Sequence, residues 1–356
     1  MRIVFLVLLS IALSACSTTI PVPAPVSLPE VERDAESEPA QQPLARVASP
    51  STSVIPEQLA VETEGEIEAE IAHKVPHDDA AAARDISRVR ALCDEIGRKL
   101  SSVSAADCQR QHMQYEAVSV LDRAIAYRDF GPLESDSLQG RVLLVGGIHG
   151  DEFSSVSVVF KWMDLLRQQA PWPLLLRVVP LANPDGLLRA KSQRQNEHGV
   201  DLNRNFPTTD WAINAQEYWV ETTAKNVRRY PGETSASEPE TRWLVAQIKE
   251  FAPDVIIALH APHHLVDYDG PPSAPQQVGK LNLRQLGVYP GSLGNYAGHD
   301  LLIPVVTLEL QSAGIMPADA EIRSMLEDLQ QWLQVQLSQR TVNSDPPSIP
   351  GNATSR

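Results

Sequence analysis

The sequence predicts an α/β domain over residues 86–337, on three observations. Apolar runs of strand length alternate with segments whose apolar residues recur at helical spacing, which is the order typical of α/β folds. The chain of 356 residues is long enough to bury a sizeable core. An acidic composition with many prolines ends near residue 85, where the alternation begins.

Each element has its own signal. Continuous apolar runs that end in Gly, Pro or a polar residue predict strands, and helical apolar spacing predicts helices. The predicted elements, in order, are the strand RVLLVGGIH (141–149), the helix 154–169, the strand LLLRVVPLANP (174–184), the helix 238–253, the strand 254–260, the strand IPVVTLEL (303–310) and the helix 318–337. Residues 338–356 are rich in Pro, Ser and Asn and are predicted to be a disordered tail.

The N-terminus has the pattern of an export signal. Residues 1–15 contain one Arg followed by an apolar run that is too short to span a bilayer as a helix. The stretch LSAC, Leu13 to Cys16, resembles the lipobox of bacterial lipoproteins, in which the Cys carries the lipid after cleavage. This resemblance implies a periplasmic, lipid-anchored protein, and Ser17 favours the outer membrane. A plain secretory signal or an uncleaved anchor is the alternative.

Residues 16–85 are predicted to be a disordered tether. From Ser17 to Asp85 there are fourteen acidic and four basic residues, so −10 of the net charge of −15 lies in this stretch, together with nine prolines. The apolar content is too low to bury, which favours a solvated segment, although the alternating Glu of VETEGEIEAEI would also fit one face of a strand. So acidic a chain argues against nucleic acid as a partner.

Cys93 and Cys108 are the two cysteines that remain if Cys16 carries lipid. Disulfides persist in the compartments of exported proteins, so we expect these two residues to form a bridge. A bridge that closes a loop of about 15 residues stabilises by roughly 3 kcal/mol in the chain-entropy model. Two unpaired thiols that behave as small apolar side chains are the alternative.

The segment VLLVGGIHGDE places His149 three residues before Glu152, just after an apolar strand. Open α/β sheets bind ligands at the carboxyl ends of their strands, and His260 ends another predicted strand. A catalytic zinc site uses three His or carboxylate ligands and leaves one position open, which these three residues would satisfy. His263 and His264 are rivals for the third position, and the His149 and Glu152 pair is a weak signal by itself.

Glu309 lies inside the apolar strand VVTLEL. An ionised carboxylate in such a strand costs several kcal/mol unless it is paired or near a metal. The residue is therefore predicted to be a general base that takes a proton from the attacking water. The alternative is that Glu309 points to solvent from an edge strand.

A polar loop, RQNEHGVDLNRNFP (194–207), follows the turn sequence NPDG (183–186). It groups Arg194 and Arg204 with Asn203, and the planar fork of a guanidinium suits the recognition of a carboxylate. The same residue types would equally serve to cap and solvate a loop.

Seven motifs follow one another between Leu143 and Leu310: HGDE, NPDG, GVDLNRNFP, SEPET, IIALHAP, PGSLGNYAG and VVTLEL. Together they resemble the zinc carboxypeptidase family, and most of all its murein peptide amidase branch. The resemblance implies a mixed, mostly parallel, twisted eight-stranded sheet sandwiched by helices. It also implies one zinc ion on His149, Glu152 and His260.

The same resemblance implies roles for the polar residues. Glu309 matches the catalytic glutamate, and Arg194 matches the arginine that steadies the oxyanion. Asn203 and Arg204 match the pair that binds the terminal carboxylate of the substrate.

Two positions depart from the family pattern. Digestive-type carboxypeptidases usually have Arg before the ligand Glu, where this chain has Asp151, as in the amidase branch and related deacylases. The mobile tyrosine of the family has no clean match. Tyr289 is the nearest substrate-binding candidate and Tyr296 a weaker one, and a structural role suits either better than a catalytic one.

The expected function is zinc-dependent hydrolysis of a peptide or amide bond next to a free-carboxylate residue. A murein stem peptide, cut between D-Glu and diaminopimelate, or another small peptide is the expected substrate, and the lipid anchor implies a membrane as a second partner. An N-acyl amino acid deacylase resembling the aspartoacylase and succinylglutamate desuccinylase group is the alternative, because that group shares an HGDE-like start and DLNR. NPDG, SEPET and TLEL argue against it. A non-catalytic lipoprotein that binds murein peptides is a third hypothesis, which the intact ligand set and Glu309 disfavour.

Overall fold

A computed structural model of the chain describes residues 79–132, 138–169, 172–271 and 273–343. The predicted signal peptide, Cys16, most of the tether and most of the tail lie outside the described residues. Helix α1 (Asp79–Lys99) begins within the last residues assigned to the tether, because the run DAAAARD is rich in alanine, a strong helix former. Helix α7 (Asp319–Asn343) continues past the predicted end of the domain at residue 337.

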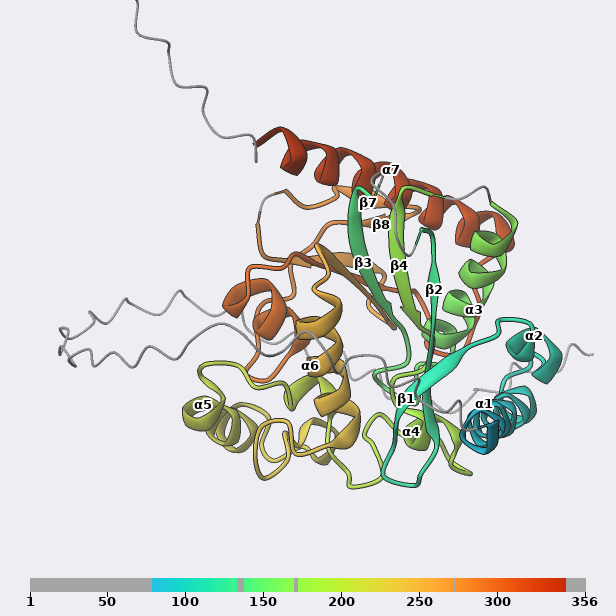
Figure 1. The fold of residues 1–356 in the computed structure, drawn as a ribbon. Coiled ribbons are helices and arrows are strands. Elements are labelled where there is room, and N and C mark those ends of the chain that lie inside the picture. The colour runs from blue at the N-terminus through green and yellow to red at the C-terminus, as the bar shows by residue number, and fades with distance from the viewer. Residues whose placement is uncertain (1–78, 133–137, 170–171, 272, 344–356) are drawn as a thin grey trace, which may run out of the picture. The chain divides into compact units, whose positions relative to one another are not determined.

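The centre of the fold is a seven-stranded mixed sheet (Figure 1). Its strands, in spatial order, are β1 (Gln114–Val118), β2 (Ala124–Phe130), β4 (Leu174–Val179), β3 (Gly140–Val145), β5 (Val255–His260), β9 (Val305–Glu309) and β6 (Leu265–Asp269). The four strands β4, β3, β5 and β9 are parallel, whereas β1, β2 and β6 pair in antiparallel fashion. The predicted α/β class is confirmed, with the parallel strands in the middle of the sheet.

The expected count of eight strands is wrong for the described residues. Beside the edge strand β6, the position of an eighth strand holds only an isolated parallel bridge between Val266 and Leu283. The chain forms instead a separate two-stranded ladder of β7 (Gln277–Val278) and β8 (Leu281–Asn282). The turn between them passes through Gly279 at φ +58°, which interrupts the run that a full strand would need.

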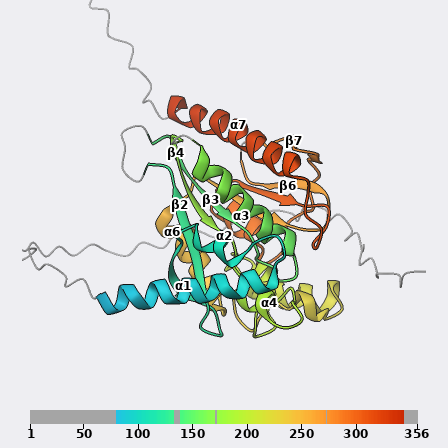
Figure 2. The same cartoon turned by 90° about the vertical axis from the view of Figure 1, so that its right-hand side faces the viewer.

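Helices cover both faces of the sheet (Figures 1 and 2). Helices α3 (Phe153–Gln168) and α7 share the core of one face with α1, and α6 (Pro239–Phe251) covers the other face. Successive residues of β3 alternate between the two cores: Val142 and Leu144 belong to the first and Leu143 to the second. This alternation is the pattern of a strand that is buried on both sides.

A disulfide joins Cys93 of α1 to Cys108 of α2 (Ala105–Gln109). Both residues are fully buried, and their Cα atoms are 5.4 Å apart.

None of the described helices combines the length and the apolar character needed to cross a membrane.

The connection from β4 to α6 contains no strand. Its elements are α4 (Pro184–Leu188), η1 (Leu202–Arg204), α5 (Trp211–Glu217), η2 (Tyr218–Thr222) and η3 (Val227–Arg229). A further helical segment, η4 (Gly294–Asp300), precedes β9. These loops and turns carry most of the polar residues around the candidate site.

Candidate metal centre

Three adjacent parallel strands bring the predicted chemical groups to one edge of the sheet. His260 is the last residue of β5 and Glu309 the last residue of β9, and the two are paired in register. His149 follows the end of the neighbouring strand β3. The carboxyl edge of a parallel sheet is where such folds bind ligands, so the strand order itself assembles the site.

Glycines let the loop from β3 to α3 run close to other backbone. Gly147 has φ +62°, a left-handed conformation that glycine adopts without strain. A Cβ atom on Gly150 would lie 2.2 Å from the carbonyl carbon of Gly186, so a larger residue would push the loop away from α4. The loop is thereby fixed between His149 and Glu152.

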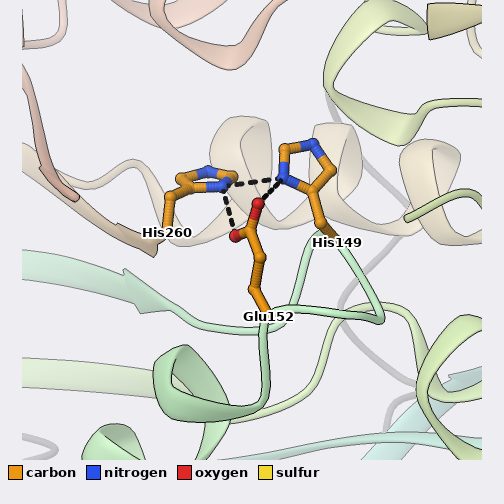
Figure 3. A group of neighbouring side chains, drawn as sticks. All are labelled: His149, Glu152 and His260. Atoms are coloured by element: carbon orange, nitrogen blue, oxygen red, sulfur yellow. Dashed lines mark hydrogen bonds and ion pairs between the residues drawn. The ribbon is translucent and has the colours of Figure 1, made fainter. Parts of the chain in front are cut away.

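The ligand atoms of three buried side chains converge (Figure 3). His149 Nδ1 lies 2.8 Å from Glu152 Oε1 and 3.0 Å from His260 Nδ1, and His260 Nδ1 lies 3.1 Å from Glu152 Oε2. The side chains come from the β3–α3 loop and from β5, and point toward one another (Figure 3).

This group fits one metal ion. Zinc bonds of about 2.0–2.1 Å place the ligand atoms of a tetrahedral site about 3.3 Å apart, close to the observed separations. Two imidazole nitrogens and a carboxylate are a donor set that zinc accepts, and three protein ligands leave a position for substrate or water. The rivals His263 and His264 are exposed and stand outside the group.

Glu309 is buried beside this group. Strand β9 lies between β5 and β6, so Glu309 does not sit on an edge strand. Burial and the negative charge of Glu152 raise the pKa of Glu309 to about 8. Burial also opposes ionisation of Glu152, but the charges of His149 and His260 outweigh it and lower the pKa of that carboxyl. The site thus holds two carboxyl groups with widely different proton affinities.

Asp201 is a site residue that sequence reasoning missed. Its Oδ1 lies 3.2 Å from His149 Nε2, and its Oδ2 accepts a 2.8 Å hydrogen bond from Arg194 Nε. Despite burial, the charge of Arg194 holds the pKa of Asp201 well below its usual range. An acceptor at Nε2 holds the proton there and leaves the Nδ1 lone pair for the metal. The only hint in the sequence was an acid between two apolar residues in GVDLN.

Arg194 reaches the ligand atoms directly. Its Nη1 lies 3.1 Å from His149 Nδ1 and 3.6 Å from Glu152 Oε1. Its position is set by the bond to Asp201, so the guanidinium faces the place where the ligand atoms converge.

Arg204 lies on the same loop and is almost fully buried. Its Nε has no hydrogen-bond partner within the part of the chain that the structure describes, which leaves a donor for a ligand. The guanidinium carbon lies 4.5 Å from the ring centroid of Tyr289, whose hydroxyl donates to Leu286 O. Tyr289 therefore supports Arg204. Asn203 accepts a 2.8 Å hydrogen bond from Leu293 N, and that bond orients its side chain.

Tyr296 is structural. It is 4% exposed and stacks on Phe206, with ring centroids 5.9 Å apart.

The motifs NPDG and SEPET also have structural roles. Asp185 of NPDG accepts hydrogen bonds from Ser119 Oγ and Arg123 Nη1, both at 2.8 Å. Glu240 of SEPET accepts from Val120 N at 3.3 Å and from Asn196 Nδ2 at 3.0 Å. Both motifs thus bind the turn between β1 and β2.

A cavity of about 360 Å³ lies along β6, with Asp267, Asp269 and His299 among its lining residues. In the sheet register, Asp269 pairs with Val305, at the opposite end of β9 from Glu309. This cavity is therefore distinct from the metal centre.

The fold and the ligand group define a metallohydrolase class, and sequence comparison identifies its family. The zinc carboxypeptidase family matches residues 100–278, half of the chain, and the chain belongs to this family. The metal for the His149, Glu152 and His260 group is accordingly one zinc ion.

Curated relatives include two murein peptide amidases. Murein peptide amidase A of Escherichia coli K12 is 36% identical over 122 residues, which cover 34% of this chain and 48% of that protein. The Vibrio campbellii protein of the same name is 30% identical over 186 residues, covering 50% of this chain and 71% of that protein. The chain thus spans about half the length of the first of these relatives.

One solved structure with a TM-score above 0.5 shares the fold, and a second is similar over a smaller part of the chain. Bovine thrombin-activatable fibrinolysis inhibitor, in complex with tick carboxypeptidase inhibitor, matches 73% of this chain and 97% of its own, with a TM-score of 0.52 and 15% identity. Murein-tripeptide amidase from Escherichia coli O157 covers 62% of this chain and 91% of its own, with a TM-score of 0.45 and 25% identity.

Proposed function

We propose that the chain is a zinc-dependent peptidase or amidase that cuts a bond next to a residue with a free carboxylate. The observation that carries this proposal is the buried Glu309 beside the His149, Glu152 and His260 group. On a neighbouring loop, Nε of Arg204 has no hydrogen-bond partner among the residues that the structure describes. A base, a metal and a carboxylate anchor are the parts that such a reaction needs.

Zinc held by these ligands would polarise the attacked carbonyl and acidify the attacking water. Glu309 accepts the proton of that water and returns it to the leaving amine. Burial raises the pKa of this carboxyl, so it binds the transferred proton more readily than an exposed carboxyl would, which suits a group that takes the proton up and passes it on. Because the Glu309 side chain is buried, bulk water is excluded around it, and its electrostatic interactions with neighbouring charges are stronger than in solution.

Arg194 and Arg204 each stabilise a different negative charge in the reaction. Arg194, held by Asp201 next to the ligand atoms, stabilises the charge that develops on the carbonyl oxygen. Arg204 and Asn203 bind the terminal carboxylate of the substrate and so select which bond lies at the metal.

We further propose a murein stem peptide as the substrate, cut between D-Glu and diaminopimelate. The support is the identity to two murein peptide amidases over part of the chain. Mass spectrometry of murein tripeptide and tetrapeptide incubated with the zinc-loaded protein tests this, with Glu309→Gln as the control. Release of diaminopimelate from the tripeptide by the wild type alone is the expected result. Activity on acylated amino acids, with both peptides left intact, would favour the deacylase instead.

The N-terminal pattern supports export and lipid attachment at Cys16, which would hold the enzyme at the periplasmic side of the outer membrane. Membrane fractionation after labelling with a fatty acid tests this location. Label should follow the wild type into the outer-membrane fraction, and Cys16→Ser should remove it. A labelled Cys16→Ser protein would refute the anchor.

A further inference from the structure

An ion pair lies directly beside the metal centre without taking part in it. Asp151 precedes the ligand Glu152, and its Oδ2 accepts a 2.8 Å hydrogen bond from Arg228 Nη1 of η3. The Arg228 side chain is 46% exposed, so this guanidinium lies at the rim of the site.

The chain on both sides of Arg228 is bound to the loop that carries Arg194 and Asp201. Gln195 Nε2 donates to Val227 O at 2.6 Å, and Asp201 N donates to Tyr230 O at 2.8 Å. These bonds hold the segment from both ends, so the place of Arg228 beside Asp151 is set by the backbone.

The pair contains an unused acceptor. Asp151 Oδ1 is buried and has no hydrogen-bond partner among the described residues, although its carboxylate is 25% exposed as a whole. A buried acceptor without a partner is unfavourable for the fold and points to a ligand group that donates to it. Because the Asp151 side chain is partly exposed, an incoming donor reaches the carboxylate from its solvent side.

An acceptor beside a guanidinium is the complement of an amino-acid head group. A free ammonium donates to a carboxylate, and a free carboxylate accepts from the planar guanidinium fork. A ligand with only one of the two charges would bind only Asp151 or only Arg228. Burial lowers the pKa of Arg204, and the charges of Arg194 and Arg229 lower it further, so the next residue, Arg229, adds positive charge near Arg204.

We infer that Asp151 and Arg228 form a second subsite, which binds the ammonium and carboxylate of an amino-acid head on the substrate. This inference rests on the proposed function. Diaminopimelate has two such heads: one provides the amine of the cut bond and the carboxylate for Arg204, and the other is free. Asp151 binds the free ammonium, and Arg228 binds the free carboxylate.

Three peptides that differ only in the residue after L-Ala-γ-D-Glu test the subsite. Diaminopimelate has the complete second head, lysine lacks its carboxylate, and 2-aminopimelate lacks its amine. Each is assayed for kcat/KM with the wild type, Asp151→Asn, Arg228→Gln and a control, Arg110→Gln, which removes an exposed arginine paired with Asp107 on α2. Affinities are measured by calorimetry in zinc-loaded protein that also carries Glu309→Gln, and zinc content is determined for every variant.

Each variant should lose the preference for one of the two charged groups on the second head of diaminopimelate. Arg228→Gln should lower kcat/KM and affinity for the diaminopimelate peptide about tenfold and leave the lysine peptide unchanged. Asp151→Asn should lower both for the diaminopimelate peptide by about the same factor and leave the 2-aminopimelate peptide unchanged. Arg110→Gln should change nothing.

An equal loss on all three peptides, or no loss, would overturn the subsite. If the wild type cleaves the peptides and the variants keep its selectivity, the subsite fails and the proposed function stands. If no peptide is cleaved but calorimetry gives the expected pattern, the reaction fails and the subsite stands. Should Asp151→Asn lose zinc, Arg228→Gln decides alone, because its residue is not adjacent to a ligand.

Discussion

His260 and Glu309 lie opposite each other at the carboxyl ends of the adjacent parallel strands β5 and β9. The pairing places a metal ligand and a buried carboxyl side by side on two rigid elements. Neither residue needs a loop to hold it, so their separation is fixed by the sheet. The catalytic proposal depends on this relationship.

Replacing Glu309 with Gln should leave zinc binding intact and lower kcat by about a hundred- to ten-thousand-fold, the usual contribution of a general base. The amide keeps the shape of the side chain but cannot accept the proton. Zinc content and turnover are measured together. Asp267→Asn, which changes a buried carboxyl on the neighbouring strand β6, is the matched control and should keep its activity. Unchanged turnover in the Glu309 variant would remove the base from the mechanism.

Asp201→Asn should weaken zinc affinity by about 10- to 100-fold, the effect typical of removing the partner of a metal-binding histidine. The negative acceptor at His149 Nε2 is lost, and Arg194 loses its partner as well. Competition with a chromogenic chelator measures the affinity. Equal affinities for variant and wild type would mean that Asp201 only packs in the loop.

Much of the site could be predicted because the pattern of apolar residues in the sequence shows where strands end. The apolar runs before His149 and before His260, and around Glu309, predicted strands, and parallel strands bring their carboxyl ends together. Asp201 could not be predicted, because its contact with His149 spans 52 residues and depends on how the loop folds back. The pair of Asp151 and Arg228 spans 77 residues and was missed for the same reason.

The strand count could not be predicted either. An eighth strand requires a continuous extended run beside β6, but the chain there turns at Gly279 between the two short strands of the β7 and β8 ladder. The family resemblance predicts the strands that its members share, whereas the presence of a further edge strand depends on local turns in each chain.

Glu240 should make stability depend on pH. Burial and the charge of Asp185 raise the pKa of Glu240 from 4.5 to about 7 in the folded protein. An acid with a raised pKa in the folded state adds stability below its unfolded pKa and loses it as pH rises through the folded value. Between pH 5 and pH 8 the wild type should lose about 2–3 kcal/mol relative to Glu240→Gln, as linkage requires for this shift.

Urea unfolding of both proteins at the two pH values measures this difference, because the variant shares all other titrating groups. A difference that stays constant between pH 5 and pH 8 would show that Glu240 does not titrate in this range.

Replacing both Cys93 and Cys108 with Ala should lower the free energy of unfolding by about 3 kcal/mol, given the 15-residue separation. The bridge joins α1 to α2, and neither cysteine belongs to the group of ligand residues, so zinc content should not change. Denaturant unfolding with metal analysis checks both statements. A loss of zinc from the folded variant would reveal a link between the bridge and the metal centre.

Anomalous X-ray scattering at the zinc absorption edge, from crystals of the zinc-loaded protein, locates the metal and so tests whether His149, Glu152 and His260 bind it. We expect one strong peak, bonded to Nδ1 of His149, to Nδ1 of His260 and to the carboxylate of Glu152. A peak at His263 or His264, or none at these three ligands, would contradict it.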